Sequence, residues 1–185
     1  KLWPIHPLDK FRDNLTEPFK MLYFGAAGVI WALDYLNKVG ATAVKEDYSM
    51  ALNELALKNR VEMALSERQT ASYWMGDVGI LLVYWRLFPT DVLADAIHRA
   101  VLANVDNPTR EFMWGAPGTM LAALFMYEFT GNGRWKEAYL QSVRQLVGEL
   151  EKNSEHDCYV WTQDLYGRSS IYLGAGHGLA ANVFS

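Results

Sequence analysis

The chain has 185 residues, of which 51% are hydrophobic, 14% aromatic and 21% charged, and its formal net charge is −4. This length suits one domain with a sizeable core, and the aromatic content excludes a disordered tail. Because Cys158 is the only cysteine, the chain is not a disulfide scaffold. The negative charge and the lack of a Lys/Arg cluster argue against a nucleic-acid module.

The chain carries no sign of a membrane span or of a leader sequence. Its charge-free apolar stretches, such as Met21–Leu33, are shorter than the ~18 residues that a spanning helix needs. Lys1 does not open a basic-then-apolar signal peptide, so we expect a cytoplasmic protein. The chain begins without Met and ends at Ser185 within a predicted helix. We therefore expect a fragment that is cut at both ends.

One motif recurs along the chain: a bulky residue, then Gly, two residues, and then Gly or Ala. Its four copies are Phe24–Gly28, Met75–Gly79, Trp114–Gly118 and His177–Ala181. An apolar run follows each of the first three copies, which predicts helices that are buried on nearly every side. Glycine leaves the start of such a helix unshielded, so we expect free backbone N–H groups that could hold an anion there. The alternative is that the glycines only relieve crowding where helices converge.

Amphipathic segments lie between these runs, at Asp47–Glu67, Asp91–Asn104 and Trp135–Leu150. Their apolar residues mostly fit a 3.6-residue period with one wet face. Thr90 is a predicted helix start, and Gly131-Asn132-Gly133 is a predicted helix stop. Sustained period-two alternation is missing from the sequence, so we predict an all-α fold. The buried helices would form an inner ring and the amphipathic helices an outer ring.

These motifs resemble those of the LanC-like lanthionine synthetases, the cyclases that close thioether rings in lanthipeptides, together with their cellular relatives. The resemblance rests on the repeated Gly-x-x-Gly helix starts and on the segments Glu111–Gly118 and Gly174–Asn182. It covers the chain from Met21 onward and implies an α/α toroid with a central zinc. Residues 1–185 would form a single domain fragment, the N-terminal half of that toroid. The four motif copies predict an incomplete ring of about four helical hairpins.

The resemblance places two catalytic roles on this chain. The family's histidine in its His-Gly motif matches His177, which would act as a general acid/base near the substrate. The family's acid, four residues before a repeat glycine, matches Glu111, although the acid in true cyclases is Asp. Converging helices would bring the pair together, which suits a reaction in which a thiol loses a proton and an enolate gains one. Alternatively, Glu111 pairs with Arg110 or caps a helix start, and His177 is held by a backbone partner.

The predicted cavity lining comes from the helix starts and from the long loop before the fourth inner helix. Its residues are Trp114, Gly115, Pro117, Gly118, Gly178, Asp164 and Arg168. Proline is favoured in the first turn of a helix, which suits Pro117. Asp164 and Arg168 belong to the long loop and would lie at the mouth of the cavity.

The zinc ligands that the resemblance implies, two Cys and one His, are not expected in this chain. Cys158 stands two residues after His156 in a polar stretch, outside any Gly-x-x-Gly motif. In the family the ligands follow the His-Gly motif well downstream. We therefore expect zinc only in the full-length protein and no cyclase activity from this chain alone. Its uncovered inner helices predict poor solubility or self-association.

Three functions remain open at the level of sequence. The first is a LanC-like cyclase that acts on a thiol-containing peptide once the missing C-terminal half completes the ring. The second is a non-catalytic LanC-like protein that binds glutathione or a partner protein, which Glu in place of Asp slightly favours. The third is a six-hairpin glycosidase or epimerase that uses Glu111, Asp164 and aromatic stacking. The Gly-x-x-Gly series is not expected in that third class.

Overall fold

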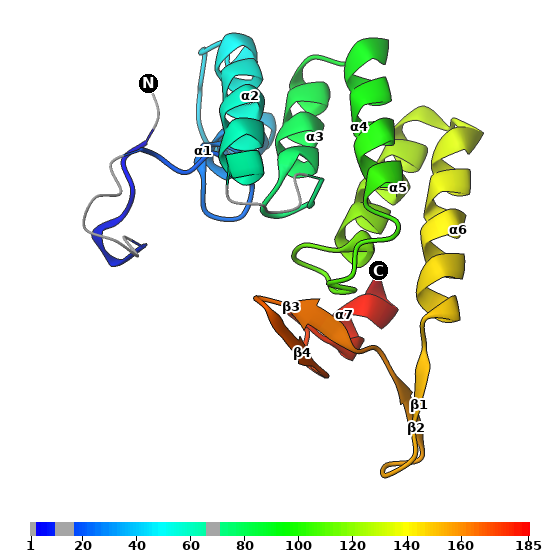
Figure 1. Ribbon diagram of the computed structural model, residues 1–185. Coiled ribbons are helices and arrows are strands. Elements are labelled where there is room, and N and C mark those ends of the chain that lie inside the picture. Colours follow the sequence, from blue (N-terminus) through cyan, green and yellow to red (C-terminus); the bar gives the residue numbers. More distant parts are fainter. Residues whose placement is uncertain (1–2, 10–16, 66–70) are drawn as a thin grey trace.

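The computed structural model describes residues 3–9, 17–65 and 71–185. About half of them form two layers of helices (Figure 1). One layer holds α1 (Ala26–Lys38), α3 (Asp77–Leu87) and α5 (Ala116–Thr130), and the other holds α2 (Ser49–Leu65), α4 (Asp91–Ala103) and α6 (Gly133–Gly148). In the first layer α3 packs between α1 and α5, and it also contacts α2 and α4. This confirms the predicted all-α fold, an incomplete α/α toroid with an inner and an outer layer.

The two layers differ in how much of each helix they bury. The inner helix α3 buries Val78, Ile80 and Leu81, which point in different directions around its axis. The outer helix α4 instead buries Ile97 and Val101, four residues apart on one face. The core is therefore formed where the inner helices meet the inward faces of the outer ones, as the two patterns predict.

The predicted helix ends agree with the structure where it describes them. The Thr90 hydroxyl accepts a hydrogen bond from the Leu93 N–H at 3.3 Å and caps α4. Gly131 ends α5 in the left-handed conformation with a φ of 64°, which glycine adopts without strain. The segment predicted to end at Glu67 forms α2, whose last residue is Leu65. Glu67 itself lies outside the described residues.

The long loop before the last helix contains short strands that the sequence did not predict. β1 (Glu151–Asn153) pairs with β2 (Cys158–Val160), and β3 (Gln163–Leu165) pairs with β4 (Arg168–Ser170), both antiparallel. Strands of three residues are too short to establish an alternating pattern. α7 (Leu179–Phe184) follows them, and a 3₁₀ turn, η1 (Pro7–Asp9), lies near the other end of the chain. Figure 1 shows β3, β4 and α7 at the end of the layers where α5 begins.

The second glycine of each of the first three motifs allows a loop to fold back over the start of its helix. A Cβ atom added to any of these glycines would lie 2.2–2.3 Å from the carbonyl oxygen six residues earlier. The three pairs are Gly28 with Leu22, Gly79 with Tyr73, and Gly118 with Phe112. Gly118 also approaches the loop before α3, since a Cβ on Gly118 would lie 3.2 Å from the Tyr73 Cβ. Close packing, the alternative reading of these glycines, thus accounts for them.

The prediction of free N–H groups at the helix starts is wrong at α1 and α7. There the first two N–H groups of the helix donate to carbonyl oxygens seven residues earlier, at 2.9–3.2 Å. The pairs are Ala26 with Phe19, Ala27 with Lys20, Leu179 with Tyr172, and Ala180 with Leu173. The loop that folds over the glycine therefore satisfies the donors that an anion would need.

An open groove of about 830 Å³ runs along α1, α3 and α5. Aromatic side chains line much of it, among them Trp31, Trp85 and Phe129. Over the described ranges, no helix has both the length and the apolar character to cross a membrane.

We predict that Gly118→Ala destabilises the protein by about 3 kcal/mol, because the new methyl group would overlap the Phe112 carbonyl oxygen. Urea unfolding measures the free energy. Gly148→Ala is the matched control, since a Cβ there meets nothing within 4 Å. It should leave stability unchanged or raise it by up to about 1 kcal/mol. Equal effects of the two changes would contradict the packing role of Gly118.

A second prediction concerns Tyr73, whose ring is buried between the layers and contacts Trp74 and Phe125. Burial raises the pKa of Tyr73 from 10.0 to about 12. The stability that this represents is present below pH 10 and is lost as the pH rises toward 12, about 2–3 kcal/mol in all. Tyr73→Phe should remove that part of the alkaline loss, which unfolding curves of both proteins between pH 9 and 12 measure. Parallel curves would contradict it.

Candidate functional site

Glu111 and His177 meet although they belong to different repeats. Glu111 lies in the loop before α5, and His177 immediately precedes Gly178, the N-cap of α7. The His177 Nδ1 is 2.7 Å from the Glu111 Oε2. Glu111 is fully buried, whereas the side chain of His177 is 37% exposed. The contact thus joins a buried carboxylate to an imidazole that solvent can reach.

The carboxylate of Glu111 also holds the turn that leads into α5. Its Oε1 accepts from the Trp114 N–H at 2.5 Å, and its Oε2 accepts from the Met113 N–H at 2.9 Å. Gly115 allows the chain to close on this turn, because a Cβ there would lie 2.8 Å from the Glu111 carbonyl oxygen. The carboxylate is therefore fixed in place before it meets the histidine.

Ser72 stands at the matching position before α3, four residues ahead of Gly76. Its hydroxyl oxygen accepts from the Met75 N–H at 3.0 Å, as Glu111 accepts from the residue three places on. The same hydroxyl donates to the Met113 carbonyl at 2.7 Å, which joins the two turns. The residue four places before the first glycine thus caps the turn in both repeats. Only Glu111 also contacts His177.

Arg110 does not pair with Glu111, contrary to one reading of the sequence. It has a left-handed backbone, with a φ of 45°, and its Nε donates to the Glu149 Oε2 at 2.7 Å. Its Nη1 donates to the Thr162 carbonyl at 3.1 Å, and its own carbonyl accepts from the Asn182 Nδ2 at 2.7 Å. Arg110 thereby ties the loop of Glu111 to the end of α6, to the strands and to α7.

Two tyrosine rings border His177 on its exposed side. The Tyr166 ring centroid lies 6.1 Å from the imidazole and that of Tyr172 lies 6.4 Å from it. The Trp114 Nε1 donates to the Tyr166 hydroxyl oxygen at 3.2 Å. Within the part of the chain that the structure describes, the hydrogen bond of the His177 ring is made by Nδ1 and not by Nε2.

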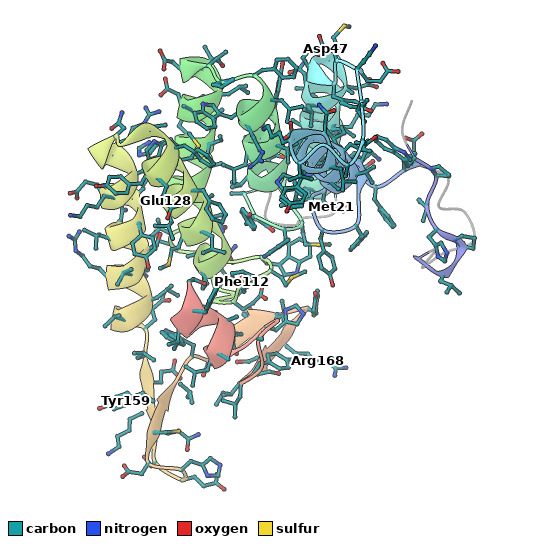
Figure 2. The ribbon with its side chains drawn as sticks, turned by 180° about the vertical axis from the view of Figure 1, so that it is seen from behind. Met21, Asp47, Phe112, Glu128, Tyr159 and Arg168 are labelled. Carbon is teal, nitrogen blue, oxygen red and sulfur yellow. The ribbon has the colours of Figure 1, made fainter. Side chains whose placement is uncertain are left out.

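The bulky residues that precede the first glycine of each motif gather beside this site. Phe24, Met75 and Trp114 pack in one apolar cluster with Leu165 of β3. His177 occupies the fourth position of that series, where the repeat carries a polar ring in place of an apolar side chain. Figure 2 shows Phe112, in the loop of Glu111, at the end of the molecule where α7 and Arg168 lie.

The other predicted cavity residues differ in burial and in their distance from the Glu111–His177 contact. Pro117 and Gly118 are buried in the first turn of α5. A Cβ on Gly178 would lie 2.4 Å from the Tyr172 carbonyl, so this position requires glycine. Asp164 in β3 and Arg168 in β4 are exposed. Among the described contacts, neither side chain reaches Glu111 or His177.

Sequence reasoning assigned no role to Tyr166, Tyr172 or Asn182. The dipeptide Tyr166-Gly167 carries a turn signal, since glycine marks tight hairpins, and it could have located the β3–β4 turn. The contacts of these rings with His177 depend on tertiary structure, which local periodicity does not encode.

The residues present do not fit a zinc site. Among those that the structure describes, no three His, Cys, Asp or Glu side chains are grouped to hold a metal ion. Cys158 is exposed on β2, and Figure 1 shows the β1–β2 hairpin extending away from α7.

Comparison with known families shows which family the chain resembles over nearly its whole length. A family described as lanthionine synthetase C-like protein matches residues 16–185, which is nearly the whole chain. A search of curated proteins finds no match to the chain.

We predict that Glu111→Ala lowers the free energy of unfolding by about 3 kcal/mol, since it leaves two backbone N–H groups without their acceptor. Glu111→Gln keeps one acceptor oxygen and should cost about half as much. Ser72→Ala, which removes one acceptor at the matching position, serves as the comparison. Denaturant unfolding measures all three. A loss under about 1 kcal/mol for Glu111→Ala would show that the carboxylate does not hold the turn.

Proposed function

Because the chain belongs to the lanthionine synthetase C-like family, we propose that Glu111 and His177 are the proton-transfer pair of a thiol-adding cyclase. Its substrate would be a peptide that carries a thiol and a dehydroamino acid, and its product a thioether ring. The observation that carries the proposal is the 2.7 Å contact between the His177 Nδ1 and the buried Glu111 Oε2. It leaves Nε2 as the reactive nitrogen.

The chemistry requires one proton to leave and one to arrive. The thiol loses its proton to solvent, and the sulfur then bonds to the β carbon of the dehydroamino acid. The electrons of the double bond move onto the neighbouring carbonyl as an enolate. Protonated His177 gives the proton on Nε2 to the α carbon and is recharged from solvent, which completes the addition.

Glu111 supports this transfer by holding the imidazole. A carboxylate bonded to Nδ1 fixes the orientation of the ring. The two backbone N–H groups of Met113 and Trp114 keep the carboxylate from turning away.

The zinc that the family resemblance implies has no ligand set among the described residues. None of the steps above passes through it. If the protein binds zinc, its metal ligands would come from outside the described residues.

The test uses the full-length protein, loaded with zinc, and a peptide with one dehydroalanine and one cysteine. Cyclisation does not change the mass of the peptide, so the loss of free thiol is followed by alkylation and mass spectrometry. His177→Gln should slow cyclisation by about 100-fold or more. Glu111→Gln should slow it less, because the imidazole and its Nε2 remain.

His98→Gln is the matched control, since His98 lies on α4 with its ring against Trp135. It should cyclise the peptide at the rate of the unchanged protein. If His177→Gln retained that rate, the assigned role of the histidine would be wrong. Glutathione binding by the unchanged protein with no ring closure would favour the non-catalytic alternative over the cyclase.

A further inference from the structure

Tyr166 occupies a backbone position that disfavours a large side chain. Tyr166 and Gly167 join β3 to β4, because Leu165 pairs directly with Arg168. Their φ angles are 55° and 72°, and positive values at both central residues define a type I′ hairpin turn. Such turns favour Asn, Asp or Gly at the first position, and a bulky residue there is strained.

Burial does not offset this strain, because the Tyr166 side chain is 68% exposed. Its specific contacts are instead with residues of the candidate site. The hydroxyl oxygen accepts from the Trp114 Nε1 at 3.2 Å, and the ring meets the Trp114 ring nearly at right angles. The Tyr166 ring also contacts His177. The two ring centroids are 6.1 Å apart, and the ring planes meet at 79°.

The anchor of Tyr166 is itself rigid. Trp114 is buried in the apolar cluster with Met75 and Leu165. Its backbone N–H donates to the Glu111 Oε1 at 2.5 Å. One tryptophan thus holds both the carboxylate that contacts His177 and the tyrosine ring that borders it. Residues with a strained backbone are concentrated at functional sites. The strained backbone of Tyr166 and its contacts with Trp114 and His177 therefore indicate a functional role rather than a packing role.

We propose that Tyr166 is a positioning residue for His177, a role that rests on the proposed function and extends it. The ring, held by the Trp114 indole, keeps the imidazole in the orientation in which Nδ1 meets Glu111. The proton of the neutral imidazole then resides on Nδ1, facing the carboxylate, and Nε2 keeps its lone pair for the substrate side. Without this ring the imidazole turns more freely and the proton distributes over both nitrogens.

Tyr166→Asn separates positioning from stability, because asparagine is a preferred residue for this turn. It should raise the melting temperature while it releases His177. Tyr166→Phe keeps the ring and loses the hydrogen bond to Trp114, so it should release His177 less. Long-range ¹H–¹⁵N NMR spectra of the ¹⁵N-labelled protein, recorded in mildly alkaline buffer where imidazoles are neutral, report which ring nitrogen carries the proton.

The unchanged protein should show His177 protonated mainly on Nδ1, and Tyr166→Asn should lower that population about twofold. Tyr159→Asn on the exposed strand β2 is the control and should leave the His177 signals unchanged. An unaltered tautomer ratio in Tyr166→Asn, or a lower melting temperature, would overturn the proposal. No substrate is needed, so a protein that fails to cyclise peptides could still show the positioning effect, and the two failures are distinguishable.

Discussion

In the first three repeats a loop carbonyl approaches the second glycine closely, and this approach determines how each loop meets its helix. Because Gly28, Gly79 and Gly118 have no side chain, the preceding loop can fold over the first turn of its helix. That fold fixes two positions in every repeat, four residues and one residue before the first glycine. The chemistry of the molecule is set by which side chains stand at those positions.

In the earlier repeats these positions are occupied by residues with structural roles. Met21 belongs to an apolar cluster, and Ser72 caps its own turn. In the third repeat Glu111 keeps the capping duty and brings a charge into the interior, and in the fourth His177 replaces an apolar residue. The candidate site therefore uses the same backbone arrangement as the other repeats. It differs from them in carrying Glu111 and His177 at these two positions.

The sequence predicts those parts of the molecule that depend on local patterns. The apolar runs, the amphipathic segments and the ends at Thr90 and Gly131 follow from helix periodicity and capping. Tertiary contacts decide the rest. The donors at the start of α1 are satisfied by a loop carbonyl that no helical pattern reveals. Arg110 bonds to Glu149 rather than to its neighbour Glu111, and its left-handed backbone is visible only in the structure.

The division of contacts between the two oxygens of Glu111 has a consequence for how the site works. Oε1 bonds to the Trp114 N–H, while Oε2 faces both His177 and the Met113 N–H. A protonated Oε2 still has a lone pair for Met113, and Oε1 is untouched by the change. The turn before α5 therefore keeps both of its hydrogen bonds whether or not Oε2 carries a proton, so its geometry does not depend on the contact with His177.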